Sequence, residues 1–207
     1  MKNISTNING PIAPLYAPLD ENAVRRIADA AFEVLAKSGM AVYSKTAFEA
    51  LRAAGAEVDG ETRIVRMPKA LVEDAVASNP SSITLCSRDG KNDVVLESSR
   101  VHYSTGGTAI YVLDPDTGDR RPSTVEDVAL NARIVQVLDN IHAFTINVFP
   151  NEIEDKNHID ANRFFHAFDN TTKHVMGGIY SLDGCKDVLR MARMIAGGEK
   201  QLRERPF

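Results

Sequence analysis

The sequence predicts an α/β fold whose second half alternates helices with apolar strands. Helical patterns begin at Ser123 and Ser181, and another carries Ala161 and Phe164 on one face. Between them lie two short apolar segments, 143–148 and 173–176. Strands that are apolar on both faces and alternate with helices are typical of βα units in a parallel sheet.

The first hundred residues predict a smaller α+β segment. Its helices are marked by caps, turn glycines and prolines, and its strands by short apolar runs. The expected elements are a helix from Asp20 to Gly39, a helix from Ser44 to Ala54, a strand at 63–67, a helix between Pro68 and Pro80, and a strand pair at 83–85 and 94–96. We therefore expect a helical, α+β extension at residues 1–100 and a different unit at 101–207.

The start of the second unit has clear local signals. The turn cluster 114–118 lies between the apolar segment 109–113 and Arg120-Arg121, which predicts a hairpin. Ser123 and Glu126 have the spacing of a capping box, which begins a helix. A later stripe of Phe164, Phe165 and Phe168 has helical spacing, so we expect all three rings to pack against the sheet.

Two parallel architectures fit this pattern. A doubly wound sheet usually has a glycine-rich phosphate turn after its first strand, and none of the usual forms of that motif occurs. A (β/α)₈ barrel needs about 250 residues, and 107 residues follow position 100 (207 − 100). The chain would then hold the first part of an incomplete barrel.

Composition excludes several classes of protein. The formal net charge of −4 and the lack of a Lys/Arg cluster argue against nucleic-acid binding. The sequence has neither the apolar core of a secretory signal at its start nor an apolar run long enough for a membrane helix, so we expect a cytoplasmic protein. The histidines form no zinc-binding pattern, and we expect no metal site.

Residues 100–180 contain five distinctive segments in a fixed order. They are Ser104-Thr-Gly-Gly-Thr108, Asp114 to Asp127, Val137-Leu-Asp-Asn140, Asn147-Val-Phe-Pro150, and Asn170-Thr-Thr-Lys-His174 with Gly177-Gly178. In order and spacing, these segments resemble the trimethylamine methyltransferase family, the corrinoid-dependent methyltransferases of methylamines and quaternary amines. The resemblance implies that the chain is the N-terminal portion of such an enzyme. It implies a partial TIM (β/α)₈ barrel preceded by the α+β extension.

The resemblance also implies a reaction and its partners. Members take a methyl group from trimethylamine or from a quaternary amine such as glycine betaine and pass it to the cobalt of a corrinoid (cobalamin) carried by a separate protein. We expect a cognate corrinoid protein and a small methylated amine as partners, a homo-oligomer at full length, and no activity from this fragment alone. A quaternary ammonium ion that loses a methyl group leaves as a neutral amine, so the site needs no proton donor. It needs aromatic faces or carboxylates that bind and orient the cation.

The candidate site follows from the barrel, because function lies at the C-terminal ends of barrel strands. Small residues there would let a flat corrinoid approach the backbone, although glycines can equally serve tight turns. Asn147 could hold the substrate or satisfy a loop amide, Glu152 could meet a cation or be solvated, and His174 could bind a ligand or be a core histidine. The predicted substrate- or corrinoid-binding residues are Thr105, Gly106, Gly107, Asn147, Glu152, His174, Gly177 and Gly178. No catalytic residue is assigned.

Two other functions remain open from the residues alone. One is a barrel lyase or aldolase acting on a phosphorylated substrate, whose phosphate would bind near strands seven and eight of the barrel. The other is a non-catalytic α/β binding module complete within 207 residues. An incomplete barrel should expose open sheet edges, whereas a finished module should not.

Overall fold

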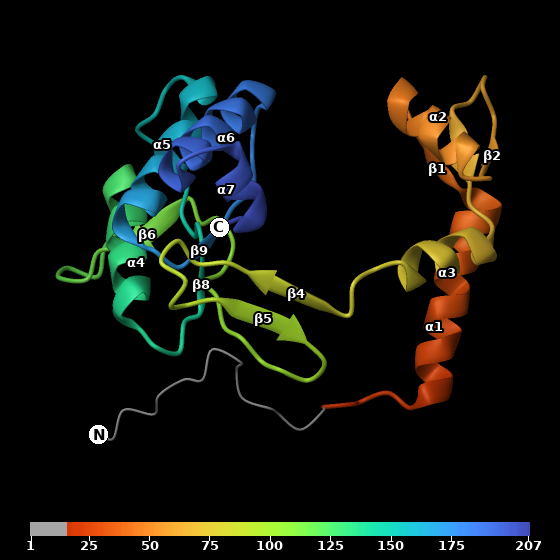
Figure 1. Ribbon diagram of the computed structural model, residues 1–207, viewed down its shortest axis with the longest axis horizontal. Coiled ribbons are helices and arrows are strands. Elements are labelled where there is room, and N and C mark those ends of the chain that lie inside the picture. Colours follow the sequence, from red (N-terminus) through yellow and green to blue (C-terminus); the bar gives the residue numbers. More distant parts are fainter. Residues whose placement is uncertain (1–15) are drawn as a thin grey trace. The chain divides into compact units, whose positions relative to one another are not determined.

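The computed structural model describes residues 16–207, which form two compact units, one ending at Ser81 and one covering 82–207 (Figure 1). The part of the predicted extension at residues 1–15 lies outside the described residues. Residues 82–100, which the sequence analysis assigned to the extension, group with the second unit.

The first unit is a small α+β unit. Its elements are α1 (Glu21–Glu33), the π-helix η1 (Val34–Ser38), β1 (Met40–Ala41), α2 (Lys45–Ala53), β2 (Glu57–Val58), β3 (Ile64–Arg66) and α3 (Lys69–Ala77). The three strands form an antiparallel sheet in the order β1-β3-β2. Asp20 and Ser44 cap α1 and α2 as predicted, each accepting a backbone N–H three residues later. Phe48 and Val65 form the centre of a small core.

The second unit begins with two antiparallel hairpins and continues with alternating helices and strands. The hairpins are β4 (Ser82–Leu85) with β5 (Val94–Glu97) and β6 (Tyr111–Leu113) with β7 (Arg120–Pro122). There follow α4 (Val125–Val137), β8 (Ala143–Thr145), α5 (Lys156–Asn170), β9 (His174–Met176), α6 (Leu182–Ala196) and α7 (Glu199–Glu204). The predicted α/β alternation is confirmed.

Three stretches of this unit run parallel, with β8 in the middle. On one side β8 pairs with β9, and Phe144 lies opposite Val175. On the other side, parallel bridges join Ser104 to Ala143 and Ala109 to Val148. The connections through α4 and α5 are therefore βα crossovers, as parallel neighbours require.

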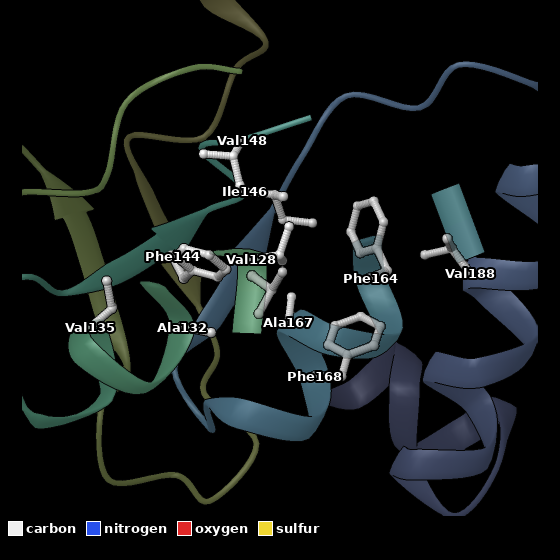
Figure 2. Close-up of a cluster of buried hydrophobic side chains, with 11 residues drawn as sticks. Val128, Ala132, Val135, Phe144, Ile146, Val148, Phe164, Ala167, Phe168 and Val188 are labelled. Carbon is white, nitrogen blue, oxygen red and sulfur yellow. The ribbon is translucent and has the colours of Figure 1, made fainter. Parts of the chain in front are cut away.

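The main core lies between the parallel strands and helices α4, α5 and α6. Figure 2 shows Phe144 and Ile146 pointing toward Val128 of α4 and Ala167 of α5, with Phe164 between them and Val188 of α6. Val128, Phe144 and Ala167 are fully buried. This core joins β8 and β9 to the three helices.

A buried lysine stabilises the end of α4. Lys173 is 3% exposed, and its ammonium group donates to the carbonyl oxygens of Val135, Leu138 and Ile141 at 2.8, 2.7 and 2.7 Å. A cation at a helix C-terminus is favourable, and all three N–H groups of this ammonium are used. Burial lowers the pKa of Lys173, while Asp139 raises it.

The predicted capping box is wrong by one residue. Thr124, not Ser123, caps α4, and Asp127, not Glu126, completes the box. The reason lies in the burial of Ser123, whose hydroxyl contacts the carbonyl of Phe149 at 2.6 Å and so is not available to the helix. Asp127 is also held by Arg121 through two contacts of 2.8 Å.

The prediction for the phenylalanine stripe is correct for two of its three rings. Phe164 and Phe168 are buried, one helical turn apart, whereas Phe165 is 54% exposed. Residue 165 is rotated by about 100° from Phe164 around the helix and therefore leaves the buried face. Among the described residues, no helix is both long and apolar enough to span a membrane.

Candidate functional site

The parallel arrangement brings most of the predicted site residues to one edge. Thr105, Gly106 and Gly107 lie between Ser104 and Ala109, the two bridge residues of the first parallel stretch, while Asn147 follows β8 and Gly177-Gly178 follow β9. Because neighbouring parallel strands end on the same side, these three loops lie next to one another. Two hydrogen bonds tie the first two loops together, from the Thr105 hydroxyl to the Thr145 carbonyl at 2.5 Å and from Ala109 N–H to the Asn147 carbonyl at 2.8 Å.

The glycines at this edge do not serve left-handed turns. Gly106, Gly107, Gly177 and Gly178 are absent from the residues with positive φ in the described chain. A Cβ atom at Gly106, Gly107 or Gly178 would have no atom within 4 Å. Neither backbone conformation nor packing within residues 16–207 therefore requires glycine at these three positions.

Gly177 is different, because it is small for packing. A Cβ atom there would lie 3.0 Å from Phe164 Cζ and 3.2 Å from Ile146 Cδ1. Side chains of the main core therefore pack against Gly177 but not against Gly178.

Asn147 contributes a polar group without a partner. Its Oδ1 is buried and has no hydrogen-bond partner among residues 16–207. An unsatisfied buried acceptor is costly, and such atoms are often completed by a ligand or by water.

Two aromatic rings flank the edge. Phe149 and Tyr180 are edge-to-face, with ring centroids 5.6 Å apart and an interplanar angle of 82°. Tyr180 is 52% exposed, so part of its ring is available to a ligand. Its ring also lies 4.9 Å from the guanidinium carbon of Arg163.

A fully buried ion pair on α5 supports the loop after β9, and sequence reasoning missed it. Asp160 accepts the backbone N–H groups of Tyr180 and Ser181, at 2.9 and 3.1 Å from Oδ2. Arg163 donates to the Gly178 carbonyl at 3.0 Å and lies 3.9 Å from Asp160. Both side chains are 0% exposed.

The same pair connects distant parts of the edge. Arg163 also contacts the Thr108 hydroxyl at 3.5 Å, so one guanidinium reaches both the first parallel stretch and the loop after the third. Burial lowers the pKa of Arg163, and Tyr180 and Asp160 act in the opposite direction. The sequence does contain a signal that this pair is buried. Asp160 and Arg163 lie one helical turn before Phe164 and Ala167, on the same face of the helix.

Two predicted residues lie away from this cluster. Glu152 is exposed and its carboxylate accepts the backbone N–H of Val125 at 2.6 Å, in the first turn of α4. His174 begins β9, at the end of the strand opposite Gly177. Its Nδ1 lies 3.0 Å from the Cys86 carbonyl, and burial lowers the pKa of His174. In residues 16–207, no three His, Cys, Asp or Glu side chains gather as a metal site would require.

Comparison with known proteins identifies the family to which the chain belongs. A family model described as trimethylamine methyltransferase (MTTB) matches residues 1–207. A trimethylamine methyltransferase MttB of Desulfitobacterium hafniense is 39% identical over 175 residues, covering 84% of the chain and 35% of that protein. A glycine betaine methyltransferase from the same species is 26% identical, covering 95% of the chain and 40% of the relative. A Methanosarcina thermophila trimethylamine methyltransferase MttB is 30% identical, covering 70% and 31%. The chain thus spans about a third of the length of these relatives.

Proposed function

The chain belongs to the trimethylamine methyltransferase family, and from this premise we propose that it is part of an enzyme that takes a methyl group from a methylated amine. The main support for the proposed site is a set of three glycines at which an added Cβ atom would have no atom within 4 Å. Gly106 and Gly107 lie between the two bridges of the first parallel stretch and Gly178 follows β9, all without a local need for glycine. Side chains are missing at the place where a large ligand would have to approach the backbone.

The substrate in this proposal is trimethylamine or a quaternary amine such as glycine betaine. The exposed ring of Tyr180, beside Phe149, offers an aromatic face to a methylated ammonium ion. When the C–N bond breaks, its electron pair stays on nitrogen, and a quaternary ion leaves as a neutral amine. The chain then has to orient the cation and exclude water, and no proton donor is needed for that substrate.

Trimethylamine itself must be cationic before it can lose a methyl group, because dimethylamide is a very poor leaving group. The free Oδ1 of Asn147 is suited to accept the N–H of protonated trimethylamine. A quaternary amine has no such N–H. We therefore assign to Asn147 the recognition of the protonated tertiary amine.

The methyl acceptor in the proposal is the cobalt of a corrinoid carried by a separate protein, which supplies a nucleophile that amino-acid side chains lack. The open backbone at Gly106, Gly107 and Gly178 fits the approach of a flat macrocycle. Arg163 contacts both Thr108 and Gly178, and would thereby hold the segments on either side of Asn147 in place.

We further propose that the parallel strands are the opening part of a (β/α)₈ barrel, with residues 1–100 as its extension, completed by further polypeptide. The shared C-terminal edge and the βα crossovers on both sides of β8 support this arrangement. The family relationship does not favour the lyase or the binding module.

The test uses the protein encoded by the whole gene, read past Phe207. It is mixed with a purified corrinoid protein in the cobalt(I) state and with trimethylamine or glycine betaine, and methylation of the corrinoid is followed by its absorbance. We expect methylation with one of the two amines, and its loss in Gly178→Val. No methylation with either amine, or full activity of Gly178→Val, would contradict the proposed site.

A further inference from the structure

A hollow of about 190 Å³ lies in the second unit and shares no residue with the glycine edge. It lies between the β4–β5 hairpin and the parallel strands, and its apolar lining consists of Leu85, Val94, Leu96, Ala143 and Met176. Leu96 and Tyr103 are exposed, so the hollow can be entered from solvent. An apolar cavity of about 150 Å³ is large enough to hold benzene.

Two histidines face each other in this lining. The rings of His102 and His142 are edge-to-face, with centroids 4.9 Å apart. His142 is 8% exposed. Its Nε2 and the Nδ1 of His102 are both buried and have no hydrogen-bond partner within residues 16–207.

The other ring nitrogens fix the tautomers. The backbone N–H of Tyr103 donates to His142 Nδ1 at 3.0 Å, so His142 carries its proton on Nε2. His102 Nε2 lies 2.9 Å from the Val95 carbonyl, which can only accept, so the proton of a neutral His102 is on Nε2. His142 thus has one free donor, Nε2–H, and His102 one free acceptor, Nδ1, and both residues line the hollow.

We propose that this hollow binds a small neutral molecule with a hydroxyl group, such as a phenol or a cyclic alcohol of about seven heavy atoms. The hydroxyl oxygen accepts the proton of His142 Nε2, and the hydroxyl hydrogen is donated to His102 Nδ1. The apolar body lies against Leu85, Val94 and Met176. One hydroxyl satisfies both nitrogens at once.

Other ligands fit less well. A metal ion would find a single available lone pair, on His102, because Tyr103 already occupies that of His142. A single water molecule finds enough partners in the two nitrogens, but at about 30 Å³ it leaves most of the apolar hollow unfilled. Burial, with His102 adding to it, lowers the pKa of His142, which keeps that ring neutral at pH 7 and gives an anion nothing to pair with.

The test is NMR of the imidazole nitrogens in the 207-residue chain, with phenol as the probe. The chain has five histidines, so their signals can be assigned by substitution. Before addition, we expect both His102 and His142 in the form protonated on Nε2. Phenol should shift His102 Nδ1 and His142 Nε2 in a saturable way and leave the exposed His158 unchanged.

Three controls separate this site from unspecific apolar binding. Toluene has the same size but no hydroxyl, and losing both hydrogen bonds should weaken binding by about tenfold or more. Leu96→Phe should fill the hollow and abolish the phenol shifts while both histidines remain, and His158→Gln should change nothing. The proposal is overturned if phenol causes no saturable shift, if toluene binds as tightly, if Leu96→Phe leaves the shifts intact, or if the free tautomers differ from those expected.

Discussion

The carboxylate of Asp160, in the middle of α5, accepts the backbone N–H of Tyr180, at 3.1 Å from Oδ1 and 2.9 Å from Oδ2. Through this contact a helix on the outside of the parallel strands determines the conformation of the loop after β9. Arg163, one turn later on α5, holds the Gly178 carbonyl in the same loop. The loop that carries Tyr180 is therefore held by buried charges at its start and at its end.

Replacing Asp160 with Asn should destabilise the second unit strongly. Arg163 is fully buried and would lose the negative charge nearest to it. Removing one partner of a buried pair typically costs about 3–5 kcal/mol. Urea unfolding of the chain measures this loss, and Asp183→Asn, at an exposed position on α6, is the matched control. Equal stability of the two variants would show that the pair has little structural role.

Replacing Lys173 with Met should loosen the end of α4. The substitution keeps a similar volume but removes the ammonium donor from the carbonyls of Val135, Leu138 and Ile141. The first two still accept the backbone N–H groups of Leu138 and Ile141, at 3.2 Å each. One unsatisfied buried carbonyl costs about 1–3 kcal/mol, and we expect a loss in that range. Amide hydrogen exchange should also become faster in the last turn of α4. Lys186→Met, an exposed lysine on α6, should leave both measurements unchanged.

Local signals explain which elements the sequence predicted well. The helices that begin after Asp20, Ser44 and Ser181 depend on one side chain that bonds to a backbone N–H three residues later. The same local logic placed the α4 cap at Ser123, one residue too early, because burial of that hydroxyl depends on Phe149, which is distant in sequence.

The supports of the candidate site could not be predicted in this way. Lys173 bonds to carbonyls 32 to 38 residues earlier, and Arg163 contacts Thr108 across 55 residues. Only the folded chain brings these groups together. Part of the edge was predictable, since Asn147 lies near the end of the expected segment 143–148 and Gly178 follows the expected segment 173–176. The difference between Gly177 and Gly178 was not, because it depends on where Phe164 packs.

The stability of the second unit should decrease as the pH falls below about 6.5, the ordinary histidine value. Burial lowers the pKa of His174 in the folded state. Between the folded and the unfolded pKa, the unfolded chain binds more protons, so stability rises with pH and is lost on acidification. His174→Gln should make the free energy of unfolding less dependent on pH between 5 and 7. His142 retains part of the slope because its pKa is also lowered. An unchanged slope in His174→Gln would contradict the expected contribution.

Adjacent glycines at the edge should respond in opposite ways to the same substitution. Gly177→Ala places a Cβ atom 3.0 Å from Phe164 and 3.2 Å from Ile146, so the core must shift. Overpacking of this kind costs about 1–3 kcal/mol, which thermal or urea unfolding will detect. Gly178→Ala meets no atom within 4 Å and has no positive φ to strain, so stability should stay the same. If the space beside Gly178 is where the substrate or the corrinoid approaches, a larger Gly178→Val should reduce methyl transfer by the whole protein while the melting temperature stays close to that of the unmodified enzyme. A Gly178→Val protein that unfolds early would instead mean that this glycine serves packing, as Gly177 does.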